Sequence, residues 1–179
     1  MQGSEFRKAS PRVTSTVAAL AVGLAVVAGQ PALGPTLEGQ LSGLFPGAAS
    51  FSPKTGNPPH FEAYAAGPAR TLVGVAFWTT DLDPLERGYD GPIKILVGLD
   101  MRGVVAGVIV SDHHEPYGYF SVDTPEFATQ FKGKSVRDEF RVGKDVQAIS
   151  RATLTVTSAT RAIRNSSRRI ATALIPPPR

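Results

Sequence analysis

The pattern of apolar and polar positions predicts strands in the middle of the chain and helices toward both of its ends. Four apolar runs with β-branched or aromatic members are typical of strands: residues 61–65, 71–80, 92–100 and 103–115. Asp100 and Gly103 lie in a tight reversal between the last two runs, which predicts a hairpin. Strands with segregated helices indicate an α+β fold, an antiparallel sheet with flanking helices.

Two short helices are predicted before and after these strands. Residues 35–48 have leucines at helical spacing and end at a Pro-Gly pair. Residues 124–133 begin with Thr124 as N-cap and Pro125 at the first helical position, and Gly133 is the expected stop.

The longest helical pattern covers residues 155–174. Its apolar face is predicted to consist of Val156, Ala159, Ile163, Ile170 and Leu174. Four arginines are expected to remain in water: Arg161, Arg164, Arg168 and Arg169. Three prolines at 176–178 stop the helix because proline lacks the N–H that continues it.

The N-terminal segment has the order of features of an export signal. A basic start precedes a short apolar run of small residues over 13–29, and MQGSEF at the very start resembles a tag remnant. Residues 1–29 are therefore predicted to be a tag remnant plus an export signal or anchor, with a buried helix as the alternative. Residues 30–179 are predicted to form a single domain, because the chain is long enough for one sizeable core and too short for two.

Composition excludes several chemistries. The chain has no cysteine, which excludes disulfides, thiolate metal sites, iron–sulfur ligation and cysteine nucleophiles. Its net charge of +4 permits an acidic partner without requiring one. The arginines of the last helix lack interleaved aromatics, so no nucleic-acid partner is expected. Nucleotide-binding glycine motifs and serine-hydrolase or zinc-protease motifs are absent from the sequence.

A first candidate site follows the last predicted strand, in VSDHHEPYGYF (110–120). Polar residues in a loop at a strand end commonly bind ligands. Strand alternation would direct His113 and Glu115 to one side and Asp112 and His114 to the other. An ordinary polar loop is the simpler interpretation. A metal-dependent hydrolase built on His113, His114 and Glu115 is a further alternative, although no additional ligand pair at metal spacing accompanies them.

A second candidate site is SRATLT (150–155), where the longest helix is about to begin. A helix start presents unpaired N–H groups and a partial positive charge, which suit a phosphate. Arg151 would add a charged donor. The alternative is that Ser or Thr side chains simply cap the helix.

Together the two stretches resemble the FMN-binding domains of the NosR/NirI proteins and of the Rnf and Na⁺-translocating NADH:quinone reductase flavoproteins. SRATLT is similar to their flavinylation motif, and HHEPYG (113–118) to a loop near their flavin. The resemblance implies that FMN is joined through its phosphate to Thr153. It also implies two groups of cofactor-binding residues: Ser150, Arg151, Ala152 and Thr155 around the phosphate, and His113, Glu115, Tyr117, Gly118 and Tyr119 near the ring.

This chain departs from the family pattern at two positions. Gln147 stands where the family usually has Asp, and Arg151 where it usually has Gly. A second motif-like stretch, TSAT (157–160), would place Thr160 in the middle of the helix, where no N–H group is free. Thr153 is therefore the predicted attachment residue.

The resemblance further implies a periplasmic, membrane-tethered domain that transfers electrons rather than transforming a substrate. The implied partners are a flavin transferase of the ApbE type, membrane-embedded iron–sulfur modules and nitrous oxide reductase. A non-redox regulatory or binding module on the same fold, without covalent flavin, is the alternative.

Overall fold

A computed structural model of the protein describes residues 33–176. The predicted tag remnant and export signal or anchor at 1–29 lie outside these residues, as do the last two prolines. No helix within residues 33–176 has the length and apolar character needed to cross a membrane.

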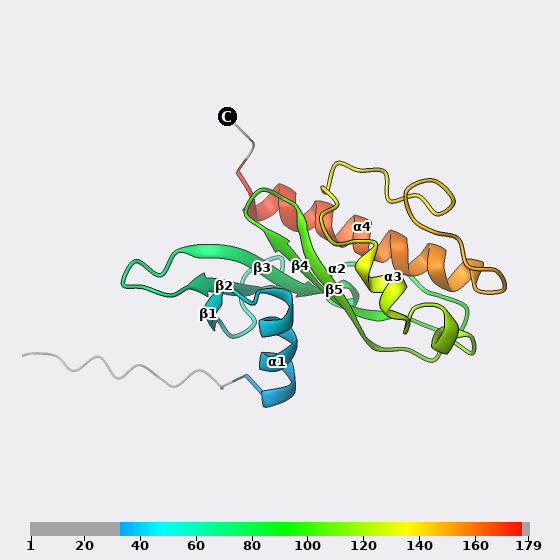
Figure 1. Cartoon of the computed structure of the whole chain (residues 1–179), viewed down its shortest axis with the longest axis horizontal. Helices are drawn as coiled ribbons and strands as arrows, with labels where there is room; N and C mark the ends of the chain where they lie inside the picture. The colour runs from blue at the N-terminus through cyan, green and yellow to red at the C-terminus, as the bar shows by residue number, and fades with distance from the viewer. Residues whose placement is uncertain (1–32, 177–179) are drawn as a thin grey trace, which may run out of the picture.

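Five antiparallel strands form one sheet in the order in which they occur along the chain (Figure 1). They are β1 Ala48–Phe51, β2 Phe61–Ala65, β3 Leu72–Trp78, β4 Lys94–Asp100 and β5 Val105–Asp112. The predicted hairpin joins β4 and β5: the Asp100 carboxylate accepts hydrogen bonds from the N–H groups of Arg102 and Val104, at 2.9 Å each. Gly103 turns the chain with φ +78°, a conformation that glycine adopts without strain.

The helices surround this sheet. They are α1 Pro35–Leu44, α2 Thr79–Leu82, η1 Gly118–Phe120, α3 Pro125–Thr129 and α4 Thr153–Leu174. Thr124 caps α3 by accepting from the Phe127 N–H, as predicted. The α+β prediction is confirmed, but α4 begins two residues earlier than the apolar pattern indicated. The short elements β1 and α2 were not predicted, because four residues show too little periodicity.

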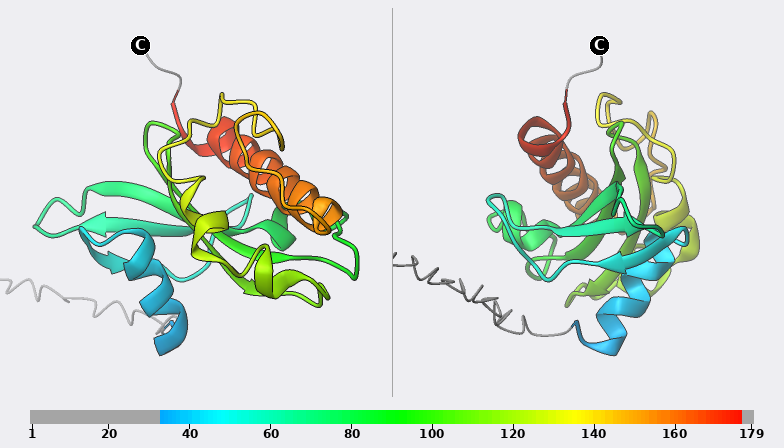
Figure 2. Two further views of the ribbon diagram at one scale, coloured as in Figure 1. Left: turned by 45° about the vertical axis from the view of Figure 1, so that its right-hand side comes forward. Right: turned by 90° about the vertical axis from the view of Figure 1, so that its left-hand side faces the viewer.

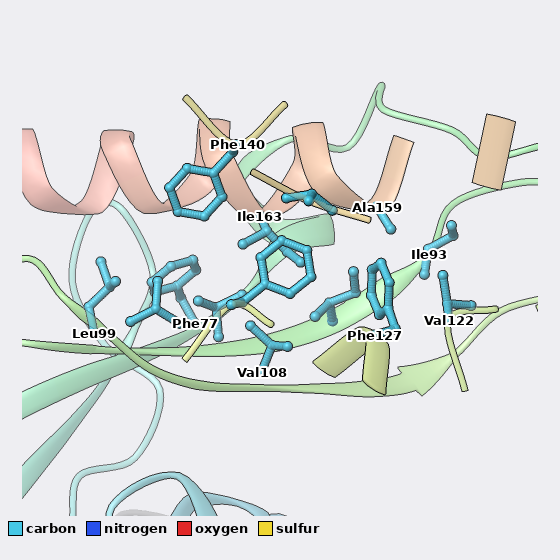
Figure 3. Packing of buried hydrophobic residues seen from close by; sticks show 14 of the residues in the cluster. Phe77, Ile93, Leu99, Val108, Val122, Phe127, Phe140, Ala159 and Ile163 are labelled. Carbon is cyan, nitrogen blue, oxygen red and sulfur yellow. The ribbon is translucent and has the colours of Figure 1, made fainter. Parts of the chain in front are cut away.

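Both faces of the sheet are covered. α4 and α3 lie over one face and α1 over the other (Figure 2). Each face of the sheet carries a hydrophobic core, a larger one with α4 and α3 and a smaller one with α1. Alternate residues of β3 and β4 belong to one core or the other, since successive side chains of a strand point to opposite faces. Phe77 and Leu99 pack toward α4 in the larger core, which Figure 3 shows with Ala159 and Ile163 of the helix. Leu96 packs in the smaller core beneath α1.

The loop between α3 and α4 inserts a phenylalanine into the larger core. Phe140 is 2% exposed and has φ +51°, which is strained for a residue with a side chain. The Asp145 carboxylate holds this conformation by accepting from the N–H groups of Phe140, at 3.0 Å, and Arg141, at 2.5 Å. Lys134 donates to the same carboxylate at 3.3 Å. Asp145 thus fixes the segment that leads into α4.

This arrangement makes the free energy of unfolding depend on pH. Burial by itself raises the pKa of Asp145, but the two N–H groups and the Lys134 ammonium outweigh burial and hold the pKa below its usual 3.8. A lowered folded-state pKa contributes stability that is present above the unfolded value and lost as pH falls through the folded value.

We expect Asp145→Asn to destabilise the protein at neutral pH, and its difference from wild type to shrink as the pH falls below the unfolded-state pKa of about 4. Urea unfolding of both proteins between about pH 6 and pH 3 measures this. Asp112→Asn, at an exposed position, is the control for the removal of one carboxylate. A destabilisation by Asp145→Asn that is the same at all pH values would contradict the assignment.

Candidate functional site

No side chain caps the first turn of α4. Thr153 is the first residue of this 22-residue helix, and the N-cap residue, Ala152, offers no side-chain hydrogen bond. The interpretation of Ser150 or Thr153 as a simple cap is therefore wrong. Ser150 and Thr153 are both exposed, whereas Ala152 is buried beneath them. A long helix with an uncapped N-terminus suits an anionic group at this end.

Arg151 adopts the left-handed conformation, with φ +68°. An L-residue with a side chain loses roughly 1 kcal/mol in that region, and glycine loses none. The left-handed backbone at this position would suit the glycine that the resemblance leads us to expect there. In this chain Arg151 adopts that conformation and carries an exposed guanidinium beside the helix start.

The two threonines of the motif-like stretches, Thr153 and Thr160, differ in accessibility. Thr160 is 1% exposed, and its hydroxyl donates to the carbonyl oxygen of Val156 at 2.6 Å. That hydroxyl is inside the protein and already bonded, so it cannot accept a bulky substituent. Thr153 lies on the surface, and the preference for Thr153 rests on this difference in accessibility.

Glu115 and Thr155 are brought together in a way that the sequence did not indicate. The Thr155 hydroxyl donates to the Glu115 carboxylate, and both residues are buried, at 3% exposed for Thr155 and 6% for Glu115. The resemblance led us to expect that Thr155 donates to the phosphate and that Glu115 faces the flavin ring. In the structure the two side chains are bonded to each other instead. Their polar groups face each other because the first turn of α4 packs on the loop after β5.

The rest of that loop is held by His113. Its Nδ1 accepts from the Glu115 N–H at 3.0 Å, which places the ring proton on Nε2, 2.8 Å from an Asp123 carboxylate oxygen. Gly118 is required beside this ring, since a Cβ there would lie 2.8 Å from Nε2. His113 and Gly118 therefore shape the loop.

Large apolar side chains are exposed on the loops and the helix turn at this end. Tyr117 is 47% exposed and Tyr119 is 73% exposed, as expected for residues that could contact a flat ring. Tyr89, at 71%, and Leu154, at 65%, were not predicted. Tyr89 could have been suspected only from its place in a Gly-Tyr-Asp-Gly turn, because nothing in its spacing links it to α4.

A hollow of about 280 Å³ is lined by Val110 and Asp123, beside the His113 loop. Another, of about 340 Å³, is at the opposite end of α4, between Arg102, Arg137 and Ile175. Within residues 33–176, no group of three or more His, Asp or Glu side chains could hold a metal ion.

The segments at this end of the molecule are similar to segments of known proteins. Residues 88–167 match the family model of the FMN-binding domain, a range that begins at the Tyr89 turn and includes both candidate stretches. Over 122 residues the chain is 30% identical to a component of an ion-translocating oxidoreductase complex from Yersinia pestis, covering 63% of this chain and 56% of that protein.

Two further relatives carry similar names. A component of the Na⁺-translocating ferredoxin:NAD⁺ oxidoreductase complex of Acetobacterium woodii is 29% identical over 87 residues, 44% of this chain and 42% of that protein. A component of an ion-translocating oxidoreductase complex from Pectobacterium atrosepticum is 42% identical over 55 residues, 29% and 26% of the two chains. The chain spans only about a quarter to somewhat over half of these relatives. Residues 88–167 of this chain are thus similar to the FMN-binding domain.

Proposed function

We propose that the domain carries FMN as a phosphoester on the Thr153 hydroxyl and transfers electrons through it. The observation that carries this proposal is the exposed Thr153 at the start of an uncapped 22-residue helix. The first N–H groups of an α-helix have no partner within the helix, and such groups suit a phosphate. The residues present therefore fit the phosphate end of FMN.

The attachment step can be written in balance. A bond forms between the Thr153 Oγ1 and the flavin-side phosphorus of a flavin dinucleotide, the anhydride bond to the second phosphorus breaks, and a nucleoside monophosphate leaves. The hydroxyl proton passes to a base of the transferring enzyme. The anhydride supplies the driving force that condensation of FMN itself with an alcohol in water lacks. A flavin transferase of the ApbE type is the partner that this step requires.

The chain's own residues then have separate tasks. The N-terminal N–H groups of α4, the Ser150 hydroxyl and the Arg151 guanidinium stabilise the phosphate charge. The exposed rings of Tyr117 and Tyr119 offer faces on which a flat ring can stack. FMN, when bound, supplies electron transfer. The protein has only to hold it at the surface, where partners can approach.

The proposed setting is a membrane-associated electron-transfer complex. Relatives named as components of ion-translocating oxidoreductase complexes support an electron-transfer complex. Membrane-embedded iron–sulfur modules are the partners that the sequence resemblance implies. The export-signal pattern over residues 1–29 supports a periplasmic location with a membrane tether. There a phosphoester would prevent loss of the flavin. The spacing of residues 88–116, which resembles the NosR branch, supports a finer role in electron supply to nitrous oxide reductase.

The intact mass of the exported protein, co-produced with a flavin transferase, tests the proposal. We expect a mass increase equal to FMN less one water, with the yellow absorbance of flavin. A yellow protein of unmodified mass would show non-covalent FMN and overturn the phosphoester. A colourless protein of unmodified mass, alongside a related flavoprotein modified by the same transferase, would favour the non-redox binding module.

A further inference from the structure

Glu115 is a buried carboxylate at the meeting point of three segments that are far apart in the sequence. Its Oε2 accepts from the Thr155 hydroxyl of α4 and from the Tyr89 N–H at 3.0 Å, and its Oε1 accepts from the Asp90 N–H at 2.9 Å. Three donors thus converge on one side chain. Hydrogen bonds to a charged acceptor are stronger than those between neutral groups.

The turn at residues 88–91 is shaped around this carboxylate. The Gly88 N–H donates to the Gly91 carbonyl at 2.8 Å and closes the turn. A Cβ on Gly88 would lie 2.7 Å from the Glu115 Cδ, so only glycine allows so close an approach. The Tyr89 N–H therefore points inward to Glu115, while its ring is largely in solvent.

The same carboxylate also bonds to the first turn of α4, whose Val156 packs in the core. Residues two apart on an α-helix point about 200° away from each other. Because Thr155 is bonded inward to Glu115, Thr153 must face outward. No side chain caps α4, and the Thr155–Glu115 hydrogen bond is a polar side-chain contact that supports this turn beside the core packing of Val156.

We propose that Glu115 is a positioning residue of the flavin site. It joins the Gly88–Gly91 turn to the first turn of α4 through Thr155 and so presents the Thr153 hydroxyl for modification. This inference rests on the proposed attachment of flavin at Thr153. It assigns Glu115 and Thr155 an internal task in place of contact with the flavin, and it adds Gly88, Tyr89 and Asp90 to the site.

The test compares two substitutions at Thr155. Thr155→Val keeps the shape but removes the hydroxyl, and Thr155→Ser keeps the hydroxyl. In the flavin-free protein, we expect Thr155→Val to accelerate amide hydrogen exchange at Tyr89 and Asp90 by about tenfold or more, since their acceptor becomes mobile. It should also slow flavin attachment, followed by intact mass at a fixed transferase concentration, by about tenfold or more. Thr155→Ser should restore both rates.

Glu86→Gln is the matched control. Glu86 lies in the same loop as the turn and accepts from Arg161 of α4 at 2.7 and 3.0 Å, about two helical turns from Thr153. The Glu86→Gln substitution should leave the rate of flavin attachment unchanged, although it weakens the contact between the same loop and Arg161. Thermal unfolding of every variant shows whether a lower rate reflects general loss of structure.

Two results would overturn the proposal. Unchanged exchange at Tyr89 and Asp90 in Thr155→Val would show that the hydroxyl does not hold the turn. Accelerated exchange with a wild-type rate of flavin attachment would show that the link does not position Thr153. Failure of the wild-type protein to take up flavin would instead reject the attachment itself, and with it the positioning role, while the exchange rates would still show whether the link exists.

Discussion

A Thr153→Ala protein, co-produced with a flavin transferase, is expected to retain the unmodified mass while the wild-type protein gains FMN less one water. The reason is chemical: alanine has no oxygen to esterify, and the other threonine of a motif-like stretch, Thr160, is buried and bonded to Val156. Thr153→Ser should remain modified, because it keeps the hydroxyl at the same helix start. Intact mass and flavin fluorescence of the denatured chain on a gel measure the result.

Thr160→Ala is the control for this result. It removes a buried hydroxyl of the same helix and should lower stability modestly, by about 1 kcal/mol, without reducing covalent flavin. Covalent flavin that persists in Thr153→Ala and disappears in Thr160→Ala would reverse the assignment. Such an outcome would require the helix to open, since the Thr160 hydroxyl is inside the protein.

Gly74→Ala is expected to destabilise the fold by about 2–3 kcal/mol, because it overpacks a site that has no room for a methyl group. A Cβ at Gly74 would lie 2.6 Å from the carbonyl oxygen of Leu99, in the neighbouring strand β4, and would also meet the ring of Phe45. The clash with backbone cannot be relieved by a rotamer change. The strands would have to separate, and α1 would no longer pack closely on the sheet.

Gly43→Ala provides the comparison for this prediction. Gly43 lies within α1, and nothing is within 4 Å of the position that its Cβ would take. Alanine in a helix is favoured over glycine by about 1 kcal/mol, so this variant should be more stable than wild type. Urea unfolding of both variants measures the difference. Equal stability of Gly74→Ala and wild type would mean that a methyl group fits at Gly74 between Phe45 and the Leu99 carbonyl.

Local patterns were sufficient where one segment determines its own structure. The apolar runs predicted four strands because side-chain alternation and β-branched content are properties of neighbouring residues. Thr124 was predicted as a cap because the acceptor and its donor are three residues apart. The same kind of reasoning placed the start of α4 at Thr155, two residues late, since Thr153 and Leu154 are exposed and do not join the apolar face.

The candidate site was predicted in its parts but not in its connections. The sequence indicated the SRATLT stretch and the His113–Tyr119 loop, and the structure places them side by side. The turn at Tyr89 was missed, and Glu115 and Thr155 were expected to face a ligand. Their hydrogen bond joins residues 40 positions apart, and no local pattern encodes such a pair.

By itself, the sequence determined the α+β class, the order of the main strands and helices, and the resemblance that points to FMN, because these depend on short-range patterns and on residue identity. Only the tertiary structure decided which threonine is accessible and which carboxylate is internal. Burial and hydrogen-bond partners result from the packing of α4 on the sheet and on the loops at its end. A hydroxyl has the same chemistry at Thr153, Thr155 and Thr160; the side of the helix on which it lies makes one a surface group and the other two part of the interior.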